Sequence, residues 1–210
     1  MNARSTALPE GEDDRHPAVA GYDIIADAFE AARKVKPWEL PYYARLADRL
    51  APGDRVLDCG CGTGHVGLAA LVEAGLSITA IDGSVGMLQH FHRRYPGVAT
   101  IRCDMLAYEP PEQFAAIIAW DSFFPLSHAE QALMIRRFAA WLRPGGLLLF
   151  TSGPGHSTIA DRMFGTPFAY ASYSDAAYRE MLGANGLSVL ASDFDEPHAA
   201  IHQVWLAQRE

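Results

Sequence analysis

Apolar and polar positions along this chain of 210 residues follow two alternating periods. Short runs rich in Val, Ile, Leu and Ala are typical of buried strands, and between them apolar residues recur every three or four positions, as on one face of a helix. This alternation predicts βαβ units on a parallel sheet. The predicted strands are residues 55–59, 77–82, 98–103, 114–120, 147–151, 187–194 and 201–207.

Helical periodicity fills most of the gaps between these strands. The helix before the fifth strand has the clearest start, because Ser127 and Glu130 have the spacing of a capping box. Two further helices precede the first strand. The second of these covers residues 41–50, and the remaining predicted helices cover residues 64–74, 84–95 and 174–184. In the first helix of the chain, the predicted apolar stripe is Ile25, Ala28, Phe29 and Ala32.

The spacing of the last two strands constrains the topology. About six residues join them, whereas a parallel crossover needs about a dozen or more, so one of the two strands must run antiparallel. The predicted fold class is α/β: a three-layer open sheet of seven strands, mostly parallel with an antiparallel C-terminal strand, and helices on both faces. We expect a flexible tail at residues 1–15 and a single domain at 16–210. Within it, residues 16–52 form cap helices, and the irregular residues 152–173 form a lid over the substrate.

Composition argues against several classes of protein. The net charge of −8 disfavours binding to nucleic acid, whose phosphates are also negative. No apolar run approaches the ~20 residues that span a bilayer, and the acidic first twenty residues lack the apolar core of a signal peptide. We therefore expect a cytoplasmic protein without a nucleic-acid or membrane partner. The three cysteines lack the paired motifs of a zinc site, so we expect no metal.

A glycine-rich turn follows the first predicted strand. Gly62 to Gly67 spell G-x-G-x-x-G, which by itself is typical of a dinucleotide site. In such a site the first glycine directly follows the strand, so that the helix N-terminus faces a pyrophosphate. Here Asp58 ends the strand and Gly60 opens the turn. A carboxylate in that place repels a pyrophosphate but suits a ligand that carries an ammonium group.

The motifs taken together resemble those of the class I S-adenosylmethionine-dependent methyltransferases. Residues 56–65, V-L-D-C-G-C-G-T-G-H, are similar to the D-x-G-x-G-x-G loop of that family. Asp82 is followed by Gly-Ser-x-x-Met-Leu, and residues 102–105 read Arg-Cys-Asp-Met, both similar to family motifs at the ends of the second and third strands. The turn into the fifth strand at residues 142–150 and the antiparallel end of the sheet also resemble the family.

This resemblance implies that the protein binds S-adenosylmethionine at the carboxyl ends of the strands. Asp82 would accept both ribose hydroxyls, Asp104 would accept from the adenine amino group, and Met105 would pack on the adenine ring. Trp120 would lie near the sulfonium, and Tyr22 would close over the carboxylate end. The implied cofactor-binding residues are Tyr22, Asp58, Gly60, Cys61, Gly62, Gly64, Asp82, Gly83, Met87, Asp104, Met105 and Trp120.

The resemblance also implies a methyltransferase that moves the methyl group to a small-molecule acceptor by in-line displacement. Such a reaction depends mainly on alignment, so no catalytic residue is assigned. Candidates for contact with the acceptor are Asp121, His128 and His156, beside the aromatic lid. We expect a small uncharged or aromatic acceptor, and a monomer or homodimer.

Two alternative functions stay open. A NAD-dependent oxidoreductase would need a glycine directly after the first strand and a sheet without an antiparallel end. A non-catalytic protein of the same fold would act through a partner, with or without the cofactor. Two other histidines are expected to have no functional role: His65 would face solvent, and His202 would lie in the core as part of the last strand.

Overall fold

A computed structural model describes residues 15–34, 36–194 and 202–210. Its centre is a seven-stranded sheet with the order β3-β2-β1-β4-β5-β9-β8. The first five strands are parallel, and β9 runs antiparallel to both of its neighbours, which confirms the predicted fold class. The strands of this sheet are β1 (Arg55–Cys59), β2 (Ser77–Asp82), β3 (Ala99–Arg102), β4 (Phe114–Ala119), β5 (Leu142–Ser152), β8 (Leu187–Phe194) and β9 (Gln203–Arg209).

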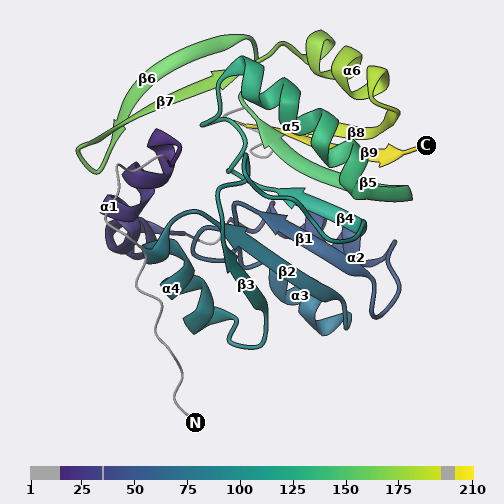
Figure 1. Cartoon of the computed structure of the whole chain (residues 1–210), viewed down its shortest axis with the longest axis horizontal. Coiled ribbons are helices and arrows are strands. Elements are labelled where there is room, and N and C mark those ends of the chain that lie inside the picture. The colour runs from purple at the N-terminus through teal and green to yellow at the C-terminus, as the bar shows by residue number, and fades with distance from the viewer. Residues whose placement is uncertain (1–14, 35, 195–201) are drawn as a thin grey trace.

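Each face of the sheet carries its own core, because alternate residues of a strand point to opposite faces. Leu57 and Ile117 pack with residues of α5 and α6, whereas Val56 and Ile118 pack with residues of α2, α3 and α4. Helices therefore cover both faces and give three layers (Figure 1). The helices are α1 (Pro17–Ala32), α2 (Leu40–Ala47), α3 (Leu68–Glu73), α4 (Val85–Arg94), α5 (His128–Trp141) and α6 (Asp175–Ala184).

Several boundaries follow directly from local chemistry. The capping box of α5 is present, with the Ser127 hydroxyl and the Glu130 carboxylate each accepting from the other's backbone N–H. The helix predicted from residue 64, however, begins only at Leu68. Residues 60–67 instead form an extended loop at the end of β1, so the glycine-rich turn is longer than the sequence pattern indicated.

The apolar stripe predicted for α1 is partly wrong. Ala28 and Ala32 are exposed, whereas Ile25 and Ala26 are buried. The reason is that α1 does not lie on the sheet: its buried residues contact Met87 of α4 and residues of the segment after β5. α1 therefore packs at the edge of the domain, over the ends of the strands.

The fifth strand begins earlier than predicted. β5 starts at Leu142, directly after α5, and the Pro-Gly-Gly sequence that was expected to separate helix from strand lies inside it. The pairing with β4 shifts between Phe114↔Leu142 and Ala116↔Leu147. Residues 143–146 thus bulge out of the ladder, because proline lacks the N–H that a regular ladder requires.

The segment expected to be an irregular lid is a β-ribbon. β6 (Ser157–Met163) and β7 (Thr166–Ser172) pair antiparallel and form a separate two-stranded sheet. In Figure 1 this ribbon arches from the α5–α6 side of the molecule toward α1. The sequence prediction missed it because the outer strand β6 is exposed along most of its length and lacks a clear apolar alternation.

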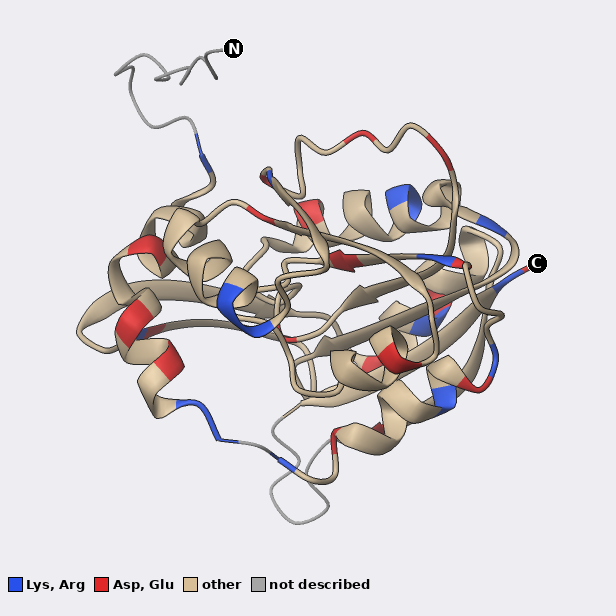
Figure 2. Ribbon diagram, turned by 90° about the horizontal axis from the view of Figure 1, so that it is seen from below, with Lys and Arg blue, Asp and Glu red and all other residues tan. Residues whose placement is uncertain are grey.

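Two predicted features fall outside the described residues. These are the tail at residues 1–15, apart from Arg15, and the start of the last predicted strand at residue 201. On the described surface, Lys and Arg are interspersed with Asp and Glu over the helices and loops, as Figure 2 shows from one side.

Candidate cofactor site

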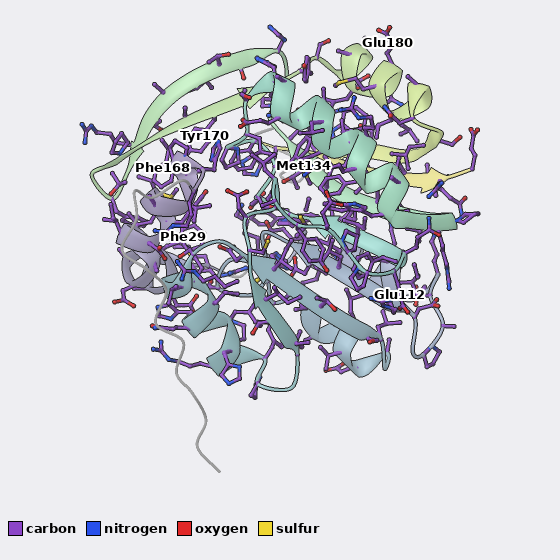
Figure 3. All side chains as sticks on the ribbon, viewed as in Figure 1. Phe29, Glu112, Met134, Phe168, Tyr170 and Glu180 are labelled. Carbon is purple, nitrogen blue, oxygen red and sulfur yellow. The ribbon has the colours of Figure 1, made fainter. Side chains whose placement is uncertain are left out.

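A cavity opens at the carboxyl ends of β1, β2 and β4, next to α1. It holds about 960 Å³ of empty space, part of it continuous with solvent. In open α/β sheets this edge is where ligands bind. Figure 3 shows Phe29 of α1 and Phe168 and Tyr170 of the ribbon on the same side of the molecule, where α1 meets the ribbon.

The structure brings nearly all the predicted cofactor residues to this one cavity. Gly64 is the exception: a Cβ atom on it would touch the rings of Tyr95 and Phe91, so it allows the loop to pack against α4. The functional roles of the predicted cofactor residues remain predictions. The predicted residues that line the cavity are Tyr22, Asp58, Gly60, Cys61, Gly62, Asp82, Gly83, Met87, Asp104, Met105 and Trp120.

Gly62 and Asp82 form one wall of the cavity. Gly62 has a φ of +53°, and a Cβ atom on it would meet nothing within 4 Å among the described residues beyond its chain neighbours. The loop backbone therefore faces open space that a side chain would fill. Gly62 N–H donates to Oδ2 of Asp82 at 2.8 Å, and Ser84 N–H donates to Oδ1 at 2.8 Å. These bonds fix the carboxylate and leave lone pairs for a ligand.

Two acids of the lining, the buried Asp58 and the half-buried Asp82, give the cavity a preference for positive charge. Burial and the charge of Asp82 together raise the pKa of Asp58 to about 7, against the opposing charge of Arg33. Burial also raises the pKa of Asp82 to about 6, against the hydrogen bonds from Ser84 and Gly62. A cationic ligand would stabilise both ionised forms.

Arg33 is a site residue that sequence reasoning missed. It directly follows α1, lines the cavity, and donates from Nη1 to the Thr63 hydroxyl at 2.7 Å. Among the described lining residues it is the only Lys or Arg. The sequence carried no signal for it, because an arginine after a helix is ordinary and its 30-residue distance from Thr63 hides the contact.

Asp104 and Met105 lie at another part of the same cavity. The His16 N–H donates to Oδ2 of Asp104 at 3.1 Å, and the Leu106 N–H donates to Oδ1 at 2.9 Å. Val19 of α1 and Met105 add apolar surface to the lining. The start of α1 is thereby tied to the end of β3, beside a slot with apolar walls and one carboxylate.

Trp120 belongs to a buried aromatic cluster. Its ring centroid lies 5.4 Å from that of Tyr43 and 5.5 Å from that of His65. His65 stacks on Tyr43 at 4.5 Å and pairs with Glu39 through Nε2 and Oε2 at 3.0 Å. The expectation that His65 faces solvent is therefore wrong. The imidazole is buried because Glu39, itself buried, supplies its polar partner.

Asp121 lines the cavity directly after Trp120. Its N–H donates to the Thr151 hydroxyl at 2.8 Å, and that hydroxyl donates to Oδ1 of Asp121 at 3.1 Å. His202 Nδ1 lies 3.3 Å from the same Oδ1. His202 comes just before β9 and pairs with this carboxylate, so its predicted place inside the strand is wrong.

The other two acceptor candidates lie elsewhere. The rings of His128 and His156 stack at 4.8 Å, and His128 Nε2 donates to the Ser172 carbonyl at 3.0 Å. His128 lines a second cavity, between the start of α5 and the ribbon, that His16 also borders. Neither His128 nor His156 is among the residues that line the cofactor cavity.

Two further observations concern the described part of the chain. Within residues 15–34, 36–194 and 202–210, no helix has the length and apolar character needed to cross a membrane. Over the same ranges, no three His, Cys, Asp or Glu side chains are grouped so as to hold a metal ion.

A mostly parallel sheet with an antiparallel β9, and a glycine loop bonded to an acid at the end of β2, define a Rossmann-like methyltransferase fold. The structure of 1,6-didemethyltoxoflavin-N1-methyltransferase from Burkholderia thailandensis has this fold. It superposes with a TM-score of 0.70 over 97% of this chain and 93% of that one, at 20% identity. The sequence profile of the family described as "Methyltransferase domain" matches residues 56–146. Residues 56–146 are therefore similar to this methyltransferase domain, and the fold of the chain is that of the class I methyltransferases.

Two curated relatives extend the comparison. Trans-aconitate 2-methyltransferase from Paracidovorax citrulli is 30% identical over 137 residues, which cover 62% of this chain and 52% of that protein. Ubiquinone biosynthesis O-methyltransferase from Xanthomonas campestris is 32% identical over 163 residues, covering 72% and 65%. The chain thus spans about half to two thirds of the length of these two relatives.

Proposed function

We propose that this protein transfers the methyl group of S-adenosylmethionine to a small-molecule acceptor. The observation that carries the proposal is the bonding of Gly62 to Asp82 at the wall of a buried cavity. Glycine lets a ligand approach the backbone closely, and the fixed carboxylate can accept from a pair of hydroxyls. Both features suit a nucleoside, and the match of residues 56–146 to a methyltransferase domain supports the choice.

The lining residues can be assigned to the different parts of this cofactor. Asp82 would hold the ribose, and Asp104 with Met105 would hold the adenine. Asp58 would face the ammonium of the amino-acid end, and Arg33 would pair with its carboxylate. Asp58 and Arg33 thus offer one negative and one positive charge, which fit the zwitterionic amino-acid end better than a pyrophosphate.

When bound, S-adenosylmethionine supplies a methyl group on a positively charged sulfur, which needs no further activation. The chain's own contribution is alignment and the exclusion of water. Tyr22 and Trp120 line the cavity with large rings. Burial, together with the charges of Asp121 and other neighbours, raises the pKa of Tyr22, so its hydroxyl stays protonated and serves as a hydrogen-bond donor.

The structure bears differently on the two alternative functions, the oxidoreductase and the non-catalytic protein. The NAD-dependent oxidoreductase predicted a sheet without an antiparallel end, and the antiparallel β9 contradicts it. A non-catalytic protein of this fold differs from the proposal only in turnover, which an assay of methyl transfer would decide. A cytoplasmic location and a monomeric or dimeric state stay predictions from the sequence.

Isothermal titration calorimetry tests the proposal directly. S-adenosylhomocysteine, the demethylated product, should bind with a Kd in the micromolar range, about −8 kcal/mol, and NAD should bind much more weakly. If NAD raised the melting temperature of the protein while S-adenosylhomocysteine left it unchanged, the proposal would be wrong.

A further inference from the structure

One charged group of the cavity has no place in the cofactor assignment above. Asp121 lies at the end of β4, beyond the acids assigned to ribose, adenine and ammonium, and it faces the same cavity. Its φ is +51°, in a region that side chains seldom adopt. The backbone and hydroxyl bonds to Thr151 hold it there. The fold therefore fixes a carboxylate at a point where no cofactor group requires one.

Tyr22, which lines the cavity, is the first of a series of aromatic rings in contact that come from distant elements. Tyr22 of α1 lies 4.9 Å from Phe168 of the ribbon, measured between ring centroids, and Phe168 stacks on Tyr170 at 6.1 Å. Tyr170 lies 5.6 Å from Phe124, on which the His202 ring stacks at 5.1 Å. The chain of rings thus runs from α1 to the histidine that pairs with Asp121.

The Asp121 carboxylate brings a negative charge to this part of the cavity. Burial alone would raise the pKa of Asp121, but the hydrogen bond and charge of His202, with Lys36 and Thr151, hold it below its usual value, so the carboxylate is ionised. Arg33, the only Lys or Arg among the described lining residues, is assigned to the cofactor's carboxylate. An anionic acceptor would lie beside the ionised Asp121, and the described residues that line the cavity include no lysine or arginine other than Arg33, so its binding would cost free energy.

We propose that the methyl acceptor is an aromatic or apolar amine whose ammonium group binds to Asp121 beside the aromatic rings. This inference rests on the proposed function and narrows its substrate class. The half-buried Asp121 carboxylate and the Tyr22 ring line the same cavity, so together they can recognise an ammonium group through charge and cation–π contact. An ammonium site at Asp121 would also distinguish this protein from an enzyme whose substrate carries carboxylates.

The reaction then balances as follows. The bound ammonium first loses one proton to water at the part of the cavity that is open to solvent, and the freed lone pair on nitrogen then forms the bond to the methyl carbon. The carbon–sulfur bond breaks with both electrons left on sulfur. The products are a protonated methylamine and the neutral thioether.

Three matched probes test the charge preference in protein saturated with S-adenosylhomocysteine: benzylamine, benzyl alcohol and benzoate. Titration calorimetry should show the tightest binding for benzylamine. In Asp121→Asn the benzylamine Kd should rise about tenfold or more, while the Kd for S-adenosylhomocysteine stays within about twofold. Asparagine is nearly isosteric and tolerates a positive φ, so the variant should keep the fold. Asp161→Asn, which removes a carboxylate from the exposed strand β6, is the matched control and should change neither value.

Several outcomes would overturn the proposal. They are tighter binding of benzoate or benzyl alcohol, no binding of any probe, or unchanged benzylamine binding in a folded Asp121→Asn. If that variant does not fold, the order of the three probes on the unmodified protein decides. Failure of S-adenosylhomocysteine itself to bind would instead refute the proposed function, so the two failures are distinguishable.

Discussion

The two ends of the cavity are built in different ways. At the cofactor end, Asp58 and Asp82 lie in β1 and β2, and Asp104 follows the neighbouring parallel strand β3, so the register of the sheet places them. At the acceptor end, Tyr22 of α1 lines the cavity and contacts Phe168 of the ribbon, a contact that exists only because these two elements pack together. One end depends on local motifs and the other on contacts between distant segments.

This difference predicts how changes at each end should behave. The cofactor end is rigid and bonded through backbone groups, so single substitutions there should have large effects on cofactor affinity. The acceptor end is assembled from side chains of separate elements, so substitutions there should affect acceptor binding or stability and leave cofactor affinity nearly unchanged.

The largest effect is expected for Gly62→Val. A branched side chain would enter the space that the ligand needs, so S-adenosylhomocysteine affinity should fall by more than about a hundredfold, or about 3 kcal/mol. Gly53→Val is the matched control, because Gly53 also has a positive φ and an open Cβ position but lies outside the cavity lining. Both variants should lose similar stability in thermal denaturation. Equal loss of affinity in the two would show that backbone strain, and not filling of the cavity, is the cause.

The second largest effect on cofactor affinity is expected for Asp82→Ala. It removes the predicted ribose acceptor and the partner of both Gly62 N–H and Ser84 N–H. Affinity for S-adenosylhomocysteine should weaken by about 1.5–3 kcal/mol, the scale of hydrogen bonds to a charged group. Asp48→Ala, on the exposed end of α2, should have no effect. An unchanged Kd in folded Asp82→Ala would remove this residue from the site.

The raised pKa of Asp58 predicts a pH dependence. Its folded pKa of about 7 lies above an unfolded value of about 4, so between these values the folded state holds more protons than the unfolded state. The contribution of Asp58 to stability therefore falls as pH rises through this window. A ligand ammonium favours the ionised carboxylate, so S-adenosylhomocysteine should bind more tightly as pH rises from about 5 to about 8, by roughly tenfold. Asp58→Asn should flatten this pH profile of affinity in calorimetry. If the variant keeps the slope of the profile, the pH dependence comes from another group.

Arg33→Met should have a smaller and selective effect. If Arg33 pairs with the carboxylate of the amino-acid end, S-adenosylhomocysteine should bind about 1–2 kcal/mol more weakly, whereas adenosine, which lacks that end, should bind as before. Calorimetry with both ligands measures the difference, with Arg49→Met on the exposed surface as the control. Equal weakening for adenosine would mean that Arg33 supports the loop through Thr63 and does not contact the ligand.

The same division explains what the sequence could and could not predict. β1 and β2 have the predicted bounds, and Asp58 and Asp82 lie at one cavity, because strand period and the glycine turn are local properties of the chain. The ribbon, the burial of His65 and the pairing of His202 with Asp121 were missed. The ribbon was missed because its strand β6 is mostly exposed and lacks an apolar alternation. The burial of His65 and the pairing of His202 each depend on a partner 26 or more residues away, and no periodicity records such a distance.

The smallest effect on cofactor binding is expected at the tip of the ribbon. Phe164 and Gly165 have φ values of +50° and +81°, the pattern of a two-residue type I′ hairpin turn, for which Asn-Gly is preferred. Phe164 is 51% exposed, so it contributes little packing that would be lost on substitution. Phe164→Asn should therefore stabilise the protein by about 0.5 kcal/mol, seen as a rise of about 1–2 °C in melting temperature.

Phe164→Ala is the control for this change, since alanine keeps the strained φ and should give no such gain. Affinity for S-adenosylhomocysteine should be the same in both variants and in the unmodified protein, because Phe164 is exposed and does not line the cofactor cavity. A change in that affinity would mean that the ribbon is coupled to the cofactor end through α1. The cavity would then respond as one unit, and the division into two independently built ends would be wrong.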